Sequence, residues 1–241
     1  MTDSTPKLTI LLALVLAGAS SLATASEASR EATPEAGPIE RQAITGQVRL
    51  VDEDGQAVRD AGEFANAVVY FEPDDPELHQ PVEAATALTT RSRQFQPRVL
   101  AIQVGTEVTF PNEDRILHNV FSNSSGNAFD LGLYGESPGE SHRFDEPGLV
   151  RIFCNVHSRM SAHIVVVDSP HYAHPARDGR CRLEDIEPAP GQLTVWHERS
   201  EPVRMRIDEL DSLHELGEIE LALTVREARP ERERRRGRRR Y

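Results

Sequence analysis

Four side chains in the middle of the chain have the types and the spacing of a metal-ligand set. Cys154, His157 and Met160 follow one another at C-x2-H-x2-M spacing, between two apolar, strand-like segments. A second imidazole, His118, stands just before another such segment. Two imidazoles, one thiolate and a weak, long thioether contact are typical of a trigonal blue-copper site. The pattern therefore predicts one copper ion held by His118, Cys154, His157 and Met160.

These ligand types suit a metal that changes oxidation state. Thiolate and thioether favour Cu(I), imidazole accepts either state, and a long axial Met tunes the potential. Three ligands on one short loop and a fourth on a separate strand would limit how far the atoms move when an electron arrives or leaves. Phe110, Phe153 and Val156 flank the ligands, and we expect them to keep water away from the metal.

Other interpretations of the same residues remain open. Met160 taken alone could be a core gap-filler, and zinc could replace copper, although an exported structural zinc site favours more Cys or His and no Met. Two cysteines in an exported protein could also form a disulfide, here between Cys154 and Cys181. We instead expect Cys181 to be a buried core residue, because it stands in an alternating apolar pattern.

Three further histidines lie in the second half of the chain. His171, His174 and His197 could form an accessory metal site, but scattered surface histidines are the preferred interpretation.

Short alternating segments separated by Gly- and Pro-containing turns predict an all-β fold. Strands are expected at residues 43–51, 67–71, 86–96, 149–153 and 162–168, among others. Many short strands at even spacing are typical of a sandwich or barrel.

The two ends of the chain have compositions of their own. Lys7, the apolar run 8–18 and the Ala23-Thr24-Ala25 motif predict a secretory signal over residues 1–25, cleaved after Ala25. The apolar run is shorter than the roughly 20 residues that a membrane span needs. Residues 26–42 read as a disordered leader, and residues 226–241, with nine Arg against three Glu, as a disordered tail. We expect an exported, periplasmic protein.

The charge of the chain is divided unevenly. The net charge is −12, and residues 226–241 contribute +6, which leaves −18 for residues 26–225 because residues 1–25 contribute none. An acidic body favours cationic partners and argues against nucleic acid as a partner. The basic tail is expected to touch an anionic membrane or an acidic partner.

The central segment, about residues 84–168, resembles the cupredoxins of the plastocyanin and amicyanin group. The matching stretches are Phe95-Gln96-Pro97 with Gly105 to Asn112, then His118-Asn119-Val120, then Cys154 to Met160, whose short spacing is similar to the amicyanin form. The resemblance implies a Greek-key sandwich and the four copper ligands predicted above. It also implies that Asn112 ties the ligand-bearing loops together and that His157 presents its ring near the surface as the electron port.

The residues beside Cys154 argue against related enzymes. Multicopper oxidases and copper nitrite reductases place His next to the ligand Cys, whereas Phe153 and Asn155 flank it here. A binuclear copper centre needs a second Cys in the loop, and only Cys154 is present. The resemblance therefore implies a carrier and no enzyme.

The flanking segments, residues 43–76 and 177–225, contain the stretches Gly46 to Gly55 and Ala67 to Tyr70, and Asp178 to Leu183 and Pro190 to Trp196. Through these stretches the segments resemble two halves of a carboxypeptidase regulatory-like (transthyretin-like) β-sandwich. Their order in the chain implies that the cupredoxin segment is inserted into this second sandwich.

The sequence thus predicts a periplasmic type 1 copper protein that carries single electrons. Its donor and acceptor would be redox proteins, such as a c-type cytochrome or a dehydrogenase. The alternatives are a copper storage or delivery module without electron turnover, and a metal-free sandwich with a Cys154–Cys181 disulfide.

Overall fold

The computed structural model describes residues 41–210 and 213–223. The predicted signal, nearly all of the predicted leader and the whole arginine-rich stretch 226–241 lie outside the described residues. Within the described ranges, no helix is both long and apolar enough to cross a membrane.

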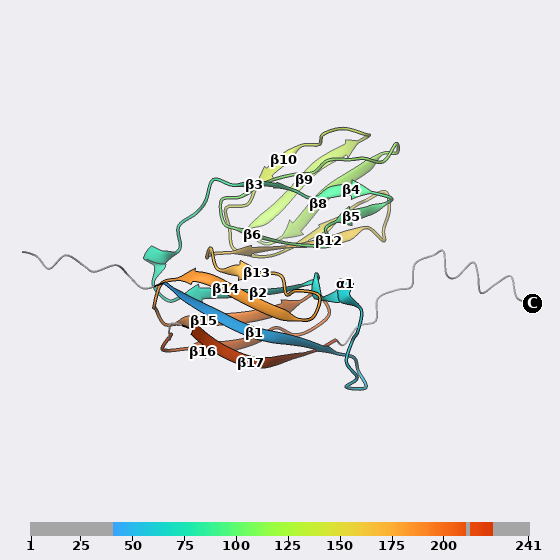
Figure 1. Ribbon diagram of the computed structural model, residues 1–241. Helices are drawn as coiled ribbons and strands as arrows, with labels where there is room; N and C mark the ends of the chain where they lie inside the picture. The colour runs from blue at the N-terminus through green and yellow to red at the C-terminus, as the bar shows by residue number, and fades with distance from the viewer. Residues whose placement is uncertain (1–40, 211–212, 224–241) are drawn as a thin grey trace, which may run out of the picture. The chain divides into compact units, whose positions relative to one another are not determined.

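The first and last parts of the described chain together form one β-sandwich, here called the flanking sandwich (Figure 1). One sheet has the order β14-β1-β17, comprising Arg180–Ile186, Gln42–Val51 and Leu213–Ala222. The other has the order β13-β2-β15-β16, comprising Tyr172–Ala173, Ala67–Pro73, Gly191–His197 and Val203–Ile207. Alternation of apolar and polar residues turns one face of each sheet inward, and Ile44, Phe71 and Leu193 are fully buried in the shared core.

The residues between β2 and β13 form the inserted sandwich, with its own core. Its five-stranded sheet has the order β6-β12-β11-β8-β9, comprising Val99–Gln103, Ser161–Val167, Gly148–Phe153, His118–Ser124 and Asn127–Tyr134. A three-stranded sheet β10-β7-β3 comprises Ser141–Arg143, Glu107–Thr109 and Ala85–Ala87, and a hairpin pairs β4 (Thr89–Arg91) with β5 (Gln94–Gln96). The predicted all-β class, with one sandwich inserted in another, is confirmed.

Only two short helical segments interrupt the strands of the described residues. They are α1 (Ala61–Phe64), in a stretch for which the sequence predicts no regular element, and the 3-10 turn η1 (Pro76–Leu78). An aspartate caps each: Asp60 accepts from the Gly62 N–H and Asp75 from the Glu77 N–H, both at 2.9 Å.

The prediction of one strand over residues 86–96 is wrong. The chain forms β3, β4 and β5 there, and it reverses direction at Ser92 and Arg93, which both have positive φ (54° and 59°). Left-handed backbone is unfavourable for residues other than Gly, so a Ser-Arg pair gives no turn signal in the sequence. The reversal depends instead on Asp114, a residue distant in sequence, as described below.

Both faces of β12 are buried, which matters because β12 begins directly after Met160. Ile164 and Val166 face the core of the inserted sandwich. Val165 and Val167 pack in a third cluster with Val68 of β2 in the flanking sandwich. Burying an aliphatic side chain is worth about 1.5–3 kcal/mol, so this strand is held firmly from both sides.

A buried carboxylate also joins the two sandwiches. Glu198 follows β15, and its side chain is 4% exposed. Its carboxylate accepts a hydrogen bond from Arg98 Nε at 2.5 Å and lies 3.3 Å from His163 Nδ1. Burial alone would raise the pKa of Glu198, but hydrogen bonds and charge from His163 and Arg98 outweigh burial and lower it to about 2.

Candidate metal centre

His118 is the first residue of β8 and is fully buried. It follows the exposed segment 115–117 and enters the sheet between β11 and β9. Its neighbour in the strand alternation, Val120, lies in the core of the inserted sandwich, so the imidazole also points inward.

The other predicted ligands lie on the loop that joins β11 to β12. The antiparallel pair Phe153 and Ser161 closes this loop at its base. The Met160 N–H donates to the His157 carbonyl at 2.9 Å, which turns the loop back on itself. Cys154 and Met160 are buried in the same core cluster, and His157 is half-buried.

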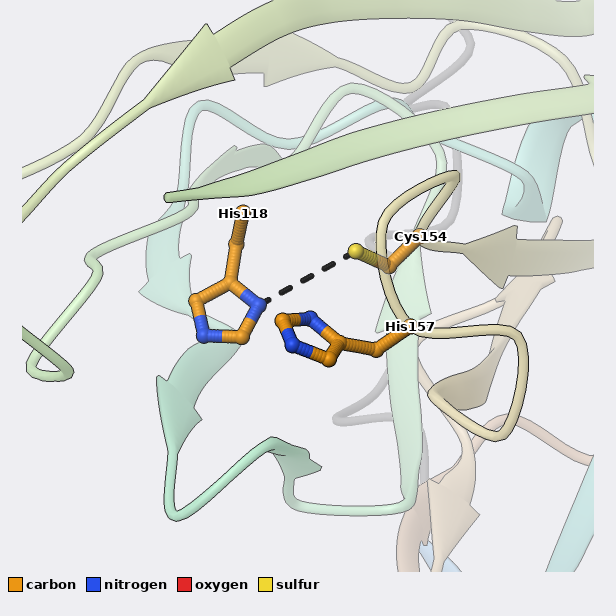
Figure 2. Close-up of side chains that lie close together, drawn as sticks. All are labelled: His118, Cys154 and His157. Carbon is orange, nitrogen blue, oxygen red and sulfur yellow. Dashed lines mark hydrogen bonds between the residues drawn. The ribbon is translucent and has the colours of Figure 1, made fainter. Parts of the chain in front are cut away.

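The structure brings three of the four predicted ligands together (Figure 2). The Sγ of Cys154 lies 3.9 Å from Nδ1 of His118, and the rings of His118 and His157 have centroids 4.7 Å apart. One ligand atom from each of the three residues lies within 4.8 Å of the others. Three nitrogen and sulfur ligands about 2.0–2.3 Å from one ion lie roughly 3.5–4 Å apart when they surround it evenly, so binding would draw the three residues together by up to about 1 Å.

The polar atoms of this group fit a metal better than they fit one another. Nδ1 of His157 is buried and has no hydrogen-bond partner. Nδ1 of His118 faces only the Cys154 sulfur, at a distance that makes a weak contact. Leaving a buried polar atom unsatisfied costs about 1–3 kcal/mol, and a metal ion between the three residues would remove that cost.

Met160 lies in the buried core of the inserted sandwich. It is 2% exposed and packs in the cluster that contains Cys154. A thioether so close in sequence to Cys154 and in the same buried cluster suits the role of a weak ligand.

Asp114 holds the imidazole of His118 from behind. Its Oδ2 lies 3.0 Å from His118 Nε2. Burial would raise the pKa of Asp114, but the N–H groups of Arg93 and Ser92 and the ring of His118 together lower it. Burial is also the main reason why the pKa of His118 is lowered. An ionised Asp114 beside a neutral imidazole requires the proton on Nε2, which leaves the lone pair of Nδ1 directed toward Cys154.

The turn at Ser92 and Arg93 forms an anion-binding nest for Asp114. The Ser92 N–H donates to Oδ1 at 2.7 Å and the Arg93 N–H to Oδ2 at 2.8 Å. Successive backbone N–H groups in a turn make such a concavity. No sequence motif marks Asp114, since its function depends on a turn 21 residues upstream.

Asn119, and not Asn112, ties the two ligand-bearing segments together. Asn119 Oδ1 accepts from the Asn155 N–H at 3.3 Å, and its Nδ2 donates to Asp130 and to the Gly132 carbonyl. Asn112 organises its own loop, donating to the carbonyls of Ile116 and Tyr134. The role expected of Asn112 is therefore wrong. Asn119 has that role, and its position directly after His118 is the sequence feature that could have indicated it.

The expected apolar shield is only partly present. Phe110 is fully buried, but Val156 is 48% exposed. Tyr134 contributes instead: its hydroxyl donates to the Phe110 carbonyl at 2.8 Å. Burial, followed by the nearby Cys154 and Glu140, raises the pKa of Tyr134 to about 12, so its hydroxyl stays neutral.

The remaining histidines and the second cysteine do not join a metal site. Among the described residues, His118, Cys154 and His157 are the one cluster of this kind. His197 is fully buried, contrary to the expected surface position, and its Nε2 faces Glu63 at 3.3 Å. Both cysteines are free, and Cys181 packs in the flanking core, so the disulfide interpretation is wrong.

Comparisons with known proteins give partial likenesses. No family model and no curated protein matches the chain. Among solved structures, a purple cupredoxin from Nitrosopumilus maritimus is 24% identical over 34% of this chain and 98% of its own, with a TM-score of 0.31. Amicyanin from Paracoccus versutus is 20% identical over 41% and 98%, with a TM-score of 0.32. A copper-containing nitrite reductase from Thermus scotoductus is 29% identical over 40% and 27%, with a TM-score of 0.32. These TM-scores are low, so the metal chemistry rests on the side chains of this chain.

Proposed function

We propose that this protein is a single-electron carrier that holds one type 1 copper ion through His118, Cys154, His157 and Met160. The observation that carries the proposal is the convergence of His118 Nδ1, Cys154 Sγ and His157 on one buried point, where His157 Nδ1 has no other partner.

Copper suits this set of ligands better than zinc does. One thiolate, two imidazoles and a thioether match a blue-copper site, whereas structural zinc sites are tetrahedral and use Cys and His without Met. Copper bound here would supply one-electron chemistry by moving between Cu(I) and Cu(II). Asp114 and Asn119, which contact both ligand-bearing segments, would limit the movement of the ligand side chains during that change.

The neighbours of Cys154 support a carrier over an oxidase. Phe153 packs its ring against Phe121 at 5.8 Å, and Asn155 is engaged with Asn119 through its N–H. Neither supplies an imidazole that could lead an electron through Cys154 to a second copper centre.

His157 offers the exit for the electron. It is half-buried, whereas His118 is fully buried, and it lies between the exposed residues Val156 and Ser158. We propose an exported, periplasmic protein because residues 1–25 have the pattern of a secretory signal. Its donor and acceptor would be redox proteins that meet the molecule near His157.

Voltammetry of the copper-loaded protein separates a carrier from a storage or delivery module. A carrier gives a reversible one-electron wave and keeps its copper through repeated cycles. A protein that releases copper on reduction, or gives no wave, is a storage or delivery module. Cys181→Ser is the matched control, because Cys181 lies in the other core and its replacement leaves the wave unchanged.

A further inference from the structure

Four loops surround the candidate metal centre and form what we call the rim. They contain residues 91–93, 113–117, 135–137 and 155–159. The first contacts the second through Asp114. Asn112, the residue just before the second, exchanges two backbone hydrogen bonds with Ser137 of the third, each 3.0 Å long. The fourth carries His157, whose ring lies beside that of His118.

The rim carries three exposed apolar side chains. Ile116, Leu117 and Val156 are 39%, 52% and 48% exposed. Each lies within two residues of His118 or His157, and together they make up half of the large hydrophobic side chains exposed in the described chain. Clustered exposed apolar residues of this kind mark contact surfaces more often than scattered ones do.

The charge of the rim is opposite to that of the body. The rim contains four arginines and three carboxylates, which gives it a net charge of +1, whereas residues 26–225 together carry −18. They are Arg91, Arg93, Arg115 and Arg159, and Glu113, Asp114 and Glu136.

Two of those three carboxylates are already engaged. Glu113 pairs with Arg91 at 2.8 Å, and Asp114 is turned inward to His118 and the nest. Arg93 and Arg115 are exposed, and the backbone of Arg93 contacts Asp114, the carboxylate behind His118. The outward charge beside the metal centre is therefore positive.

For a partner in contact with the rim, the charge of the rim matters more than the net charge of the whole protein. Charges further apart than about 8 Å are largely screened at physiological ionic strength, so the acidic body acts weakly on a partner docked at the rim. A complementary patch on the partner steers association and fixes orientation. The expectation of a cationic partner, which followed from total charge, does not apply to this face.

We propose that the rim is the docking surface for a redox protein with an anionic patch around an apolar centre, and that Arg93 and Arg115 recognise that patch. This proposal rests on the proposed electron-carrier function. In the docked complex one electron passes between the partner's redox group and the copper centre: one is oxidised and the other reduced by one electron.

The test compares electron transfer from two reduced cytochromes c, one with an anionic and one with a cationic surface around the haem edge. The copper-loaded, oxidised protein is mixed with each in stopped flow over a range of salt concentrations. Comparing variant with wild type for each cytochrome cancels their different driving forces. The double variant Arg93→Glu/Arg115→Glu should slow the anionic cytochrome about tenfold at low salt and speed the cationic one.

The control variant Arg182→Glu/Arg204→Glu changes the net charge equally in the flanking sandwich, where both residues are exposed. It should change either rate less than twofold. Equal effects of the two double variants, or faster reaction of the anionic cytochrome with the rim variant, would overturn the proposal. Both readouts require a protein that keeps its copper spectrum, so a missing spectrum counts against the proposed function and a present one isolates the docking claim.

Discussion

Asp114 Oδ2 and His118 Nε2 lie 3.0 Å apart, so the ring that faces the metal centre is held from behind by a carboxylate. That carboxylate is in turn held by the Ser92 and Arg93 N–H groups. The orientation of a buried ligand thus depends on a surface turn of a separate hairpin.

Asp114→Asn should weaken copper binding. The variant loses the charge that fixes the proton on His118 Nε2, and loss of such a supporting group typically costs about 10–100-fold in metal affinity. Competition with a copper chelator, followed by visible absorption, measures the change. Glu113→Gln is the control, because Glu113 pairs with the exposed Arg91; an equal effect of both variants would contradict the role given to Asp114.

Ser92→Gly should stabilise the fold. Ser92 has φ of 54°, and left-handed backbone costs a non-Gly residue roughly 1–2 kcal/mol. Glycine keeps the N–H that Asp114 accepts, so the expected gain in free energy of unfolding is about 0.5–1 kcal/mol after the greater freedom of the unfolded chain is counted. Denaturant unfolding of the metal-free protein measures it. Thr89→Gly, in the adjacent strand, should destabilise, and a loss with Ser92→Gly would contradict the account.

Asn119→Ala should destabilise the protein by about 1–3 kcal/mol and speed copper loss, because it leaves the Asn155 N–H and the Gly132 carbonyl without this partner. Asn123→Ala tests the specificity of that effect, since Asn123 is exposed on the same strand. Thermal unfolding and copper release to a chelator are the two measurements. Similar values for the two variants would remove Asn119 from its role.

Glu198 should make stability depend on pH. Its folded pKa of about 2 lies below the ordinary 4.5, so its contribution is fully present above about pH 4.5 and is lost as the pH falls toward 2. From that shift, Glu198→Gln should lower the free energy of unfolding by about 3 kcal/mol at pH 7, and the difference from wild type should shrink between pH 5 and pH 3. Glu201→Gln, at an exposed position, should show neither effect. A difference for Glu198→Gln that stays constant with pH would contradict the assignment.

Local patterns predicted the parts of the centre that are local in sequence. The C-x2-H-x2-M loop and His118 were visible because each stands beside an apolar alternating strand, and His118, Cys154 and His157 do converge. What the sequence could not show depends on pairs distant along the chain. The turn at Ser92 contains no residue typical of a hairpin turn, and Asp114, which is distant in sequence, stabilises it instead.

Two other differences between the sequence-based predictions and the structure also come from contacts between residues distant along the chain. Asn119 was overlooked because its partner, Asn155, lies 36 residues away. His197 was expected at the surface because no local pattern shows that Glu63 and Arg199 surround it; Arg199 donates its N–H to His197 Nδ1 at 3.1 Å and pairs with Glu63 at 2.9 Å.

The absorption and EPR spectra after addition of one equivalent of Cu(II) test the central claim most directly. Wild type should show an intense thiolate-to-copper charge-transfer band, Cys154→Ser should lose it, and Cys181→Ser should keep it, because Cys181 Sγ contacts the Gly46 carbonyl in the other core at 3.4 Å. Unfolding curves of the metal-free variants verify that each is folded. A folded wild-type protein without the band, or a Cys154→Ser variant that retains it, would contradict a type 1 copper centre at this site.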